Sequence, residues 1–89
     1  MQVNLSPRFK RAYKKLPGNV KDDFDLKISL FMENPNNPSL KTHKLKGKIQ
    51  GCLSFYLING YRVLFETISS HEVNLLDAGP HDKYRKWPE

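Results

Sequence analysis

The sequence has only one cysteine, Cys52, among its 89 residues. An internal disulfide therefore cannot form, and nothing in the cysteine content points to an oxidising compartment. No stretch approaches the roughly 20 consecutive apolar residues that span a membrane, and the first residues lack the apolar run of a signal peptide. These absences predict a cytoplasmic protein that is neither exported nor inserted into a membrane.

The residues that usually hold metals or phosphate-bearing cofactors are also sparse. The three histidines and Cys52 lack the close spacing of metal ligands, such as Cys-x-x-Cys or His-x-x-x-His. Gly47 and Gly51 flank Lys48, but they do not form the pattern of a phosphate-binding loop. We therefore expect neither a metal nor any other cofactor.

Acidic residues are missing from the first 21 positions and from residues 34–65. The whole chain carries 15 Lys and Arg against 9 Asp and Glu, which gives a formal net charge of +6. Because the positive surplus is concentrated in two stretches, the pattern favours a basic patch and a polyanionic partner. A solvated helix face explains the N-terminal cluster equally well.

The length predicts a single small domain over residues 1–89 and excludes a multidomain enzyme. Hydrophobic residues make up 38% of the chain, so the core must be thin. The five Phe, four Tyr and one Trp are expected to supply much of the buried area.

A weak edge strand at residues 2–5 precedes the first predicted helix. Ser6 suits the N-cap position and Pro7 the first helical position, where its missing N–H costs nothing. Four apolar residues then recur with helical spacing, and they are Phe9, Ala12, Tyr13 and Leu16. Pro17-Gly18 ends this helix.

A second helix is predicted to start after Pro17-Gly18, antiparallel to the first. Asn19 is the expected N-cap, and Asp22 and Asp23 would then interact favourably with the helix dipole from the first turn. The predicted buried face consists of Val20, Phe24, Ile28 and Phe31. Asn34-Pro35 stops the helix, since a residue before proline avoids the helical conformation.

The next region, residues 34–51, is predicted to be ordered, basic and partly extended, with Leu40, Leu45 and Ile49 as its anchors. Loops of this length in compact domains are usually functional or disordered. We favour the ordered alternative.

A β-hairpin follows, with Asn59-Gly60 between two strands at residues 52–58 and 61–66. A two-residue turn would mix apolar and charged side chains on both faces of the sheet. A three-residue loop with Gly60 in the left-handed conformation instead separates them. One face then carries Leu53, Phe55, Leu57, Tyr61, Val63 and Phe65, and the other carries Ser54, Tyr56, Arg62, Leu64 and Glu66.

A last strand at residues 72–78 is apolar enough for an interior position in the sheet, and Gly79-Pro80 ends it. The predicted fold class is α+β, a small antiparallel sheet with two N-terminal helices packed on one face.

Three residues suit cleavage of RNA without a metal, because RNA supplies its own nucleophile in the 2′-hydroxyl. The guanidinium of Arg62 is always charged and can donate two parallel hydrogen bonds to two phosphate oxygens. His81 suits a general acid for the departing 5′-oxygen, because histidine is the side chain whose unperturbed pKa lies nearest neutrality. Tyr84 lies three residues beyond His81 and could orient it, bind the phosphate or stack on a base. An ordinary surface arginine, an ordinary loop histidine and a tail-anchoring tyrosine are the competing interpretations.

Three short motifs resemble the RelE/ParE toxin family of bacterial toxin–antitoxin systems. They are Leu45-Lys46-Gly47 before the hairpin, Gly60-Tyr61-Arg62-Val63-Leu64-Phe65 after it and Gly79-Pro80-His81-Asp82-Lys83-Tyr84 at the end. The resemblance covers nearly the whole chain. It implies the RelE-like fold, metal-free cleavage of messenger RNA on the ribosome, and inhibition by a cognate antitoxin protein.

The resemblance also implies roles for individual residues. Arg62 matches the family's transition-state arginine, His81 matches the C-terminal histidine that serves some members as general acid, and Tyr84 falls near the tail tyrosine of others. The expected RNA-binding residues are His43, Lys44, Lys46, Lys48, Lys83 and Arg85.

The chain departs from the family pattern on the strand before the hairpin, where several relatives carry basic residues and this chain has Ser54 and Tyr56. Lys44, Lys46 and Lys48 are the candidates to replace that charge. No residue matches a general base clearly, and His43 and Glu66 are the candidates.

Two other functions stay open at this point. A ParE-like protein would inhibit DNA gyrase without cutting RNA, and a non-catalytic module would only bind nucleic acid through its basic surface. The pair of His81 and Tyr84 favours the nuclease over the gyrase inhibitor.

Overall fold

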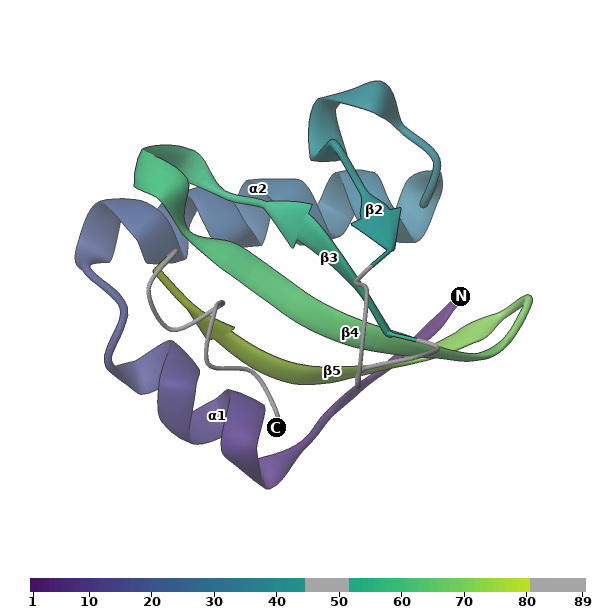
Figure 1. The fold of residues 1–89 in the computed structure, drawn as a ribbon, viewed down its shortest axis with the longest axis horizontal. Coiled ribbons are helices and arrows are strands. Elements are labelled where there is room, and N and C mark those ends of the chain that lie inside the picture. Colours follow the sequence, from purple (N-terminus) through teal and green to yellow (C-terminus); the bar gives the residue numbers. More distant parts are fainter. Residues whose placement is uncertain (45–51, 81–89) are drawn as a thin grey trace.

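The computed structural model describes residues 1–44 and 52–80, with the side chain of His43 left out. Its strands are β1 (Gln2–Leu5), β2 (His43–Lys44), β3 (Cys52–Tyr56), β4 (Arg62–Ser69) and β5 (Glu72–Gly79). Its helices are α1 (Pro7–Lys14), α2 (Gly18–Glu33) and two short 3₁₀ turns, η1 (Pro38–Leu40) and η2 (Ile58–Gly60). The five strands form one sheet in the order β1-β5-β4-β3-β2 (Figure 1). The predicted α+β class is confirmed.

The sheet is mixed, which corrects the prediction of a fully antiparallel sheet. β1 pairs with β5 in parallel, with Val3 opposite Val73 and Leu5 opposite Leu75. The other neighbours are antiparallel. Side-chain alternation along a strand gives its faces but not its direction relative to a neighbour, so the sequence carried no signal for this pairing. The predicted interior position of the last strand is confirmed, because β5 lies between β1 and β4.

Helix α1 begins where the sequence predicts. The Oγ of Ser6 accepts a hydrogen bond from the backbone N–H of Phe9 at 3.0 Å, which is the N-cap interaction. The same hydroxyl donates to the carbonyl of Leu76 at 3.2 Å and so fastens the start of α1 to β5. The helix then runs alongside β5, whereas α2 passes behind the sheet and crosses the view in the opposite direction (Figure 1).

Helix α2 starts earlier than predicted, and Asn19 is not its N-cap. The carbonyl of Pro17 accepts hydrogen bonds from the N–H groups of Val20 and Lys21, both at 3.0 Å, so Pro17 is the cap residue. Asp23 consequently lies beyond the first turn. Its Oδ2 accepts a hydrogen bond from the N–H of Ile58 at 2.9 Å, which ties α2 to the hairpin loop. The predicted stop is confirmed, since α2 ends at Glu33 and the next residue is extended.

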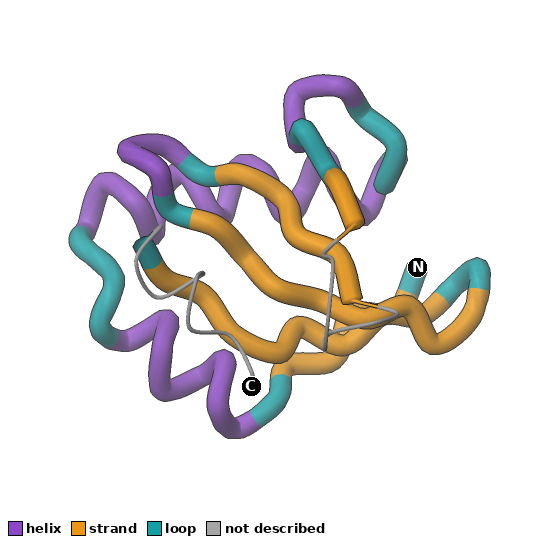
Figure 2. Tube along the Cα trace, viewed as in Figure 1, coloured by secondary structure: helices purple, strands orange, loops and turns teal. Residues whose placement is uncertain are grey.

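The hairpin has the predicted three-residue loop. Tyr56 is opposite Arg62, and the N–H of Leu57 donates to the carbonyl of Tyr61 at 2.8 Å, which leaves η2 as the loop. Gly60 is left-handed as expected, with φ of 77°, and Asn59 joins it with φ of 59°. Figure 2 shows this loop and the turn between β4 and β5 at opposite ends of the sheet.

Both helices pack on one face of the sheet around a cluster of aromatic rings. Phe31 of α2 lies 5.3 Å from Phe55 and 5.0 Å from Phe65, measured between ring centroids. Phe24 joins α2 to α1 through a 5.4 Å contact with Phe9. The face predicted from the three-residue loop is therefore the core face. Within the described ranges, neither helix is long and apolar enough to cross a membrane.

Candidate functional site

Arg62 is the first residue of β4. Its side chain lies on the face of the sheet that points away from the helices. Its neighbour Val63 is fully buried in the helix-side core, and alternation along the strand turns Arg62 to the other side. The guanidinium carbon lies 4.3 Å from the ring centroid of Tyr56, its cross-strand partner. This cation–π contact orients the guanidinium of Arg62, a residue that is half-buried.

A buried carboxylate lies on the same face, and the sequence reasoning missed it. Asp77 of β5 is opposite Leu64, but the next pair along the ladder is Phe65 with Leu75. Leu76 is therefore an extra residue, a β-bulge, and the bulge reverses the alternation of β5. Strict alternation would have placed Asp77 with Val73 and Leu75 in the core, whereas the bulge turns it to the face of Arg62.

Asp77 is held by a cation from α1. The Nε of Arg8 lies 3.1 Å from Oδ2 of Asp77, whose side chain is 0% exposed. The N–H of Ala78 donates to Oδ1 at 2.8 Å. An ionised carboxylate is stable in the interior only when it is paired and hydrogen-bonded in this way.

The face that carries Arg62 is less open than predicted. Leu64 is 2% exposed and Ser54, its cross-strand partner, is 0% exposed. The Oγ of Ser54 is buried and makes no hydrogen bond within the described part of the chain. The placement of Ser54 and Leu64 on the face of Arg62 is as predicted, but both residues are buried there.

Glu66, one of the two candidates for a general base, lies away from Arg62 and is hydrogen-bonded to another strand. It lies four residues from Arg62 along β4, about 13 Å at the usual rise of a strand. Its Oε2 accepts a hydrogen bond from Nδ2 of Asn74 at 3.1 Å. Asn74 in turn accepts one from Asn4 of β1 at 2.9 Å. Glu66 thus belongs to a polar network that joins three strands, away from the arginine.

Cys52 lies opposite Glu66 at the start of β3. Burial raises the pKa of its thiol above the ordinary value, and the negative charge of Glu66 raises the pKa further. A raised pKa keeps the sulfur protonated at neutral pH and makes it a poor nucleophile. Cys52 therefore lacks the lowered pKa of a catalytic cysteine.

The predicted basic residues are only partly described. Lys44 is exposed in β2, and His43 occupies the register position opposite Ser54. The other predicted site residues lie outside the described residues, and they are Lys46, Lys48, His81, Lys83, Tyr84 and Arg85. Across residues 1–44 and 52–80, no group of three or more His, Cys, Asp or Glu side chains is arranged to hold a metal ion.

The same fold occurs in solved structures of bacterial and archaeal toxins. YafQ from E. coli strain BL21(DE3) superimposes with a TM-score of 0.77 at 14% identity, covering 93% of this chain and 96% of YafQ. The YoeB/ParE toxin from Agrobacterium tumefaciens gives 0.75 at 15% identity, covering 91% and 99%. A chain of the RelBE toxin–antitoxin complex of E. coli gives 0.70 at 22% identity, covering 89% and 94%.

Neither the known protein-family models nor the curated protein sequences give a match. The likeness is thus one of structure, and at these identities it establishes the fold. The fold is that of the RelE-like toxins.

Proposed function

We propose that this protein is a RelE/ParE-family toxin of a type II toxin–antitoxin system and that it cleaves messenger RNA on the ribosome without a metal ion. One observation carries the proposal. In a fold shared with RelE, YafQ and YoeB toxins, a half-buried guanidinium is held against Tyr56 on the face away from the helices. A guanidinium that is held in place before the reaction suits a phosphate whose charge grows during the reaction.

The proposed chemistry needs few groups. The 2′-hydroxyl of the RNA attacks the neighbouring phosphorus and the 5′-oxygen departs. Arg62 neutralises the charge that develops on the phosphoryl oxygens, and His81 donates a proton to the departing oxygen. Tyr84 orients His81 or binds the phosphate.

The sheet register supports the pairing of Arg62 with His81. Gly79, the last residue of β5, is the register partner of Arg62. His81 follows Gly79 in the chain after Pro80 alone, so only two peptide units connect it to that position. We retain His43 as the candidate general base, because Glu66 lies too far from Arg62 along β4.

Expression in a bacterial host tests the proposal. The wild-type protein is expected to stop growth and the incorporation of labelled amino acids into protein before DNA synthesis slows, and transcript ends should reveal new cuts within translated messages. Arg62→Ala and His81→Ala are each expected to lower the rate of cleavage by about 10²-fold or more. Each variant should therefore relieve the growth arrest. Arg11→Ala removes the same charge from an exposed position of α1 and serves as the control.

Two results would overturn the proposal. Full toxicity of both variants, with melting temperatures like that of the wild type, would reject the assigned roles. An arrest of DNA replication that precedes any fall in protein synthesis would indicate a ParE-like gyrase inhibitor.

The proposed partner is a cognate antitoxin protein. Several of the similar structures are complexes of a toxin with its antitoxin, among them the E. coli RelBE and DinJ-YafQ complexes. Their existence supports the expectation that a small protein binds this chain and blocks its basic surface.

A further inference from the structure

A groove of about 410 Å³ lies between α1 and α2. Its lining residues are Leu5, Phe9, Lys10, Tyr13, Lys14 and Phe24. The rings of Phe9 and Tyr13 lie 5.4 and 5.5 Å from that of Phe24, measured between centroids, so the floor of the groove is aromatic. Leu5 beside it is 45% exposed. Exposed apolar surface next to polar residues commonly marks an interaction site.

The α1 side of this groove is basic. Lys10 and Lys14 are both exposed and, because they are four residues apart, they lie on the same side of the helix. Helix α1 contains no acidic residue. Neither lysine forms a salt bridge within residues 1–44 and 52–80. Their positive charge therefore lies beside the aromatic floor without a carboxylate partner in that part of the chain.

The neighbouring side of α2 carries the opposite charge. Four exposed residues recur there at the spacing of one helix face, and they are Asp22, Asp25, Ser29 and Met32. The Tyr13 hydroxyl donates a hydrogen bond to Oδ1 of Asp25 at 3.2 Å, so this stripe borders α1. Burial raises the pKa of Tyr13, and the negative charges of Asp25 and Asp22 raise it further, which agrees with two carboxylates beside the ring.

Both lysines of α2 are engaged within the molecule. The Nζ of Lys27 lies 3.1 Å from Oδ2 of Asp23, on the side of the helix that contacts the hairpin loop. The Nζ of Lys21 lies 5.6 Å from the ring centroid of Tyr13. Among the described residues, neither lysine forms a salt bridge with Asp22 or Asp25. These two carboxylates are thus suited to bind cations of another chain.

A surface that is basic along one helix and acidic along the next is self-complementary. A two-fold axis that lies in the interface and runs along the groove places α1 of each copy over α2 of the other. Rotation about this axis keeps every residue at its level along the groove, and the hydrogen bond from Tyr13 puts Asp25 at the level of Tyr13. Lys14, the next residue of α1, then faces Asp22 and Asp25 of the second copy. The symmetry makes this contact twice.

The same rotation supplies an apolar side chain to the groove. Met32 is 47% exposed and ends the acidic stripe of α2. Because α1 and α2 run in opposite directions (Figure 1), the later turns of α2 lie toward the Leu5 end of the groove. An unbranched methionine adapts to irregular gaps, and its sulfur makes favourable contacts with aromatic rings. Met32 of the second copy therefore suits the aromatic floor.

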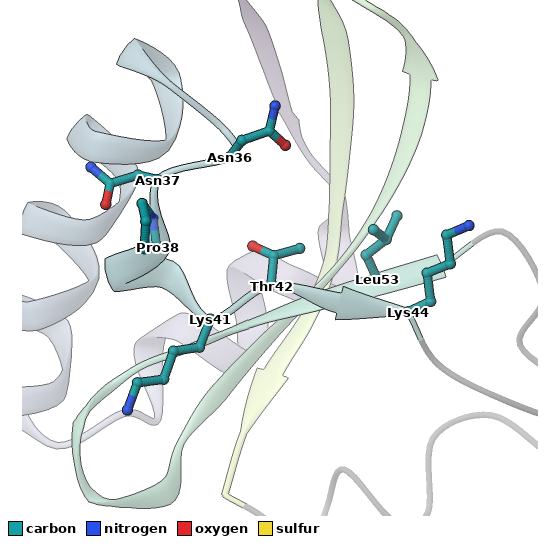
Figure 3. A pocket seen from close by; sticks show the side chains of 7 residues that line it. All are labelled: Asn36, Asn37, Pro38, Lys41, Thr42, Lys44 and Leu53. Carbon is teal, nitrogen blue, oxygen red and sulfur yellow. The ribbon is translucent and has the colours of Figure 1, made fainter.

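The cavity shown in Figure 3 differs in its charge. It has a volume of about 370 Å³, lies at the edge of the sheet and is lined by Lys41 and Lys44. None of the described residues that line it is acidic. A second copy would bring only more positive charge to this cavity, whereas the groove between the helices offers both signs.

Two helices side by side offer enough area for a weak but specific dimer. Helix α2 has 16 residues, which is about 24 Å at the usual rise, and each helix is about 10 Å wide. The shared surface is therefore about 500 Å² per copy, or about 1,000 Å² in total, which is the lower end for a specific interface. The formal net charge of +6 on each copy opposes association. We expect a dimer that dissociates in the micromolar range.

We propose that the groove between α1 and α2 is a self-association surface, through which two copies of this chain form a symmetric dimer with α1 of each copy on α2 of the other. The association does not depend on the proposed nuclease function. Arg62 lies on the face of the sheet that points away from the helices, so this contact does not cover it.

Sedimentation velocity of the purified full chain at increasing micromolar concentrations tests the dimer. We expect the wild type to shift from monomer to dimer, and Met32→Asp to weaken the association at least tenfold because a charge would enter the aromatic groove. Ile68→Asp is the control, since Ile68 is 52% exposed but belongs to β4. Met32→Ser gives the same comparison with a milder change, and circular dichroism melts confirm that each variant is folded.

A mixing experiment tests the arrangement of the helices. Lys14→Glu alone brings like charges together at two places of the dimer, and so does Asp22→Lys, so each variant should dimerise about tenfold more weakly than the wild type. An equimolar mixture of the two should recover the wild-type affinity, because each changed residue then meets the opposite charge. Arg11→Glu makes the same charge change at an exposed residue of α1 that does not line the groove, and its mixture with Asp22→Lys should show no recovery.

Three results would overturn the proposal. A wild-type protein that stays monomeric at all concentrations would reject self-association, and the groove would then belong to another partner, such as the antitoxin. Equal weakening by Met32→Asp and Ile68→Asp would show that the dimer does not use this groove. Failure of Lys14→Glu and Asp22→Lys to recover the affinity when mixed would reject the packing of α1 on α2.

Discussion

The Nε of Arg8 lies 3.1 Å from the buried carboxylate of Asp77, and this pair joins the first turn of α1 to the sheet face that carries Arg62. The arginine side chain is 54% exposed and the aspartate side chain is 0% exposed. One partner is thus in contact with solvent while the other is buried. Helix α1, which Ser6 caps, and strand β5 are held together by this contact and by the Ser6 hydroxyl.

We expect Arg8→Ala to lower the free energy of unfolding by about 1.5–3 kcal/mol, the range for a hydrogen bond to a charged group. The loss should stay below that of a fully buried pair because Arg8 is half exposed. Urea unfolding followed by circular dichroism measures it. Arg11→Ala is the control, and Arg8→Ala combined with Asp77→Asn should cost less than the two single changes added together. Equal unfolding midpoints for Arg8→Ala and Arg11→Ala would contradict the prediction.

Arg62→Lys keeps the positive charge but removes the planar guanidinium that stacks on Tyr56. A lysine cannot form two parallel hydrogen bonds to a phosphate, so we expect cleavage to fall by about 10²-fold, nearly as far as in Arg62→Ala. Quantitative mapping of cut transcripts after induction measures the effect. Tyr56→Phe keeps the ring and should retain most activity; wild-type cleavage by Arg62→Lys would show that charge alone is sufficient.

Gly60→Ala should destabilise the hairpin by about 1–2 kcal/mol, because φ at this position is 77° and a side chain there is strained. Gly18 offers the matched comparison, since a Cβ built on it meets no atom within 4 Å and it opens α2. Gly18→Ala is therefore expected to raise stability by about 0.4–1 kcal/mol through the unfolded state. Thermal melts of the two variants should move in opposite directions, and a common direction would refute the argument.

The raised pKa of Cys52 predicts a pH-dependent reactivity. Alkylation by iodoacetamide requires the thiolate, so the midpoint of its pH profile should be higher in the folded protein than in the urea-unfolded chain. Glu66→Gln should lower the midpoint only part of the way, because burial is the larger cause and the charge of Glu66 the smaller. Identical midpoints in folded and unfolded protein would disprove the assignment.

The hairpin was predictable because local chemistry and face alternation agree there. Asn59-Gly60 marks the turn, and only a three-residue loop puts Phe55, Val63 and Phe65 on one face. The Ser6 cap and the stop of α2 at Asn34-Pro35 were predictable for the same reason, since each depends on residues adjacent in sequence.

The start of α2 was less predictable. Asn19 is a better N-cap residue by preference, yet the carbonyl of Pro17 accepts the first hydrogen bonds. The earlier start coincides with a tertiary contact in which Asp23 accepts a hydrogen bond from Ile58, 35 residues away. A preference for one cap residue is worth about 1 kcal/mol, which long-range contacts readily exceed.

The linear order of residues determined the two helices, the hairpin register and the placement of Arg62 away from the core, since each follows from spacing and from neighbours close in the chain. Only the folded molecule decided that β1 runs parallel to β5, that a bulge at Leu76 turns Asp77 toward the Arg62 face, and that Arg8 of α1 pairs with this buried carboxylate. The reason is that such features arise where segments distant in sequence meet, and strand direction, bulges and cavities are properties of the contact between two segments.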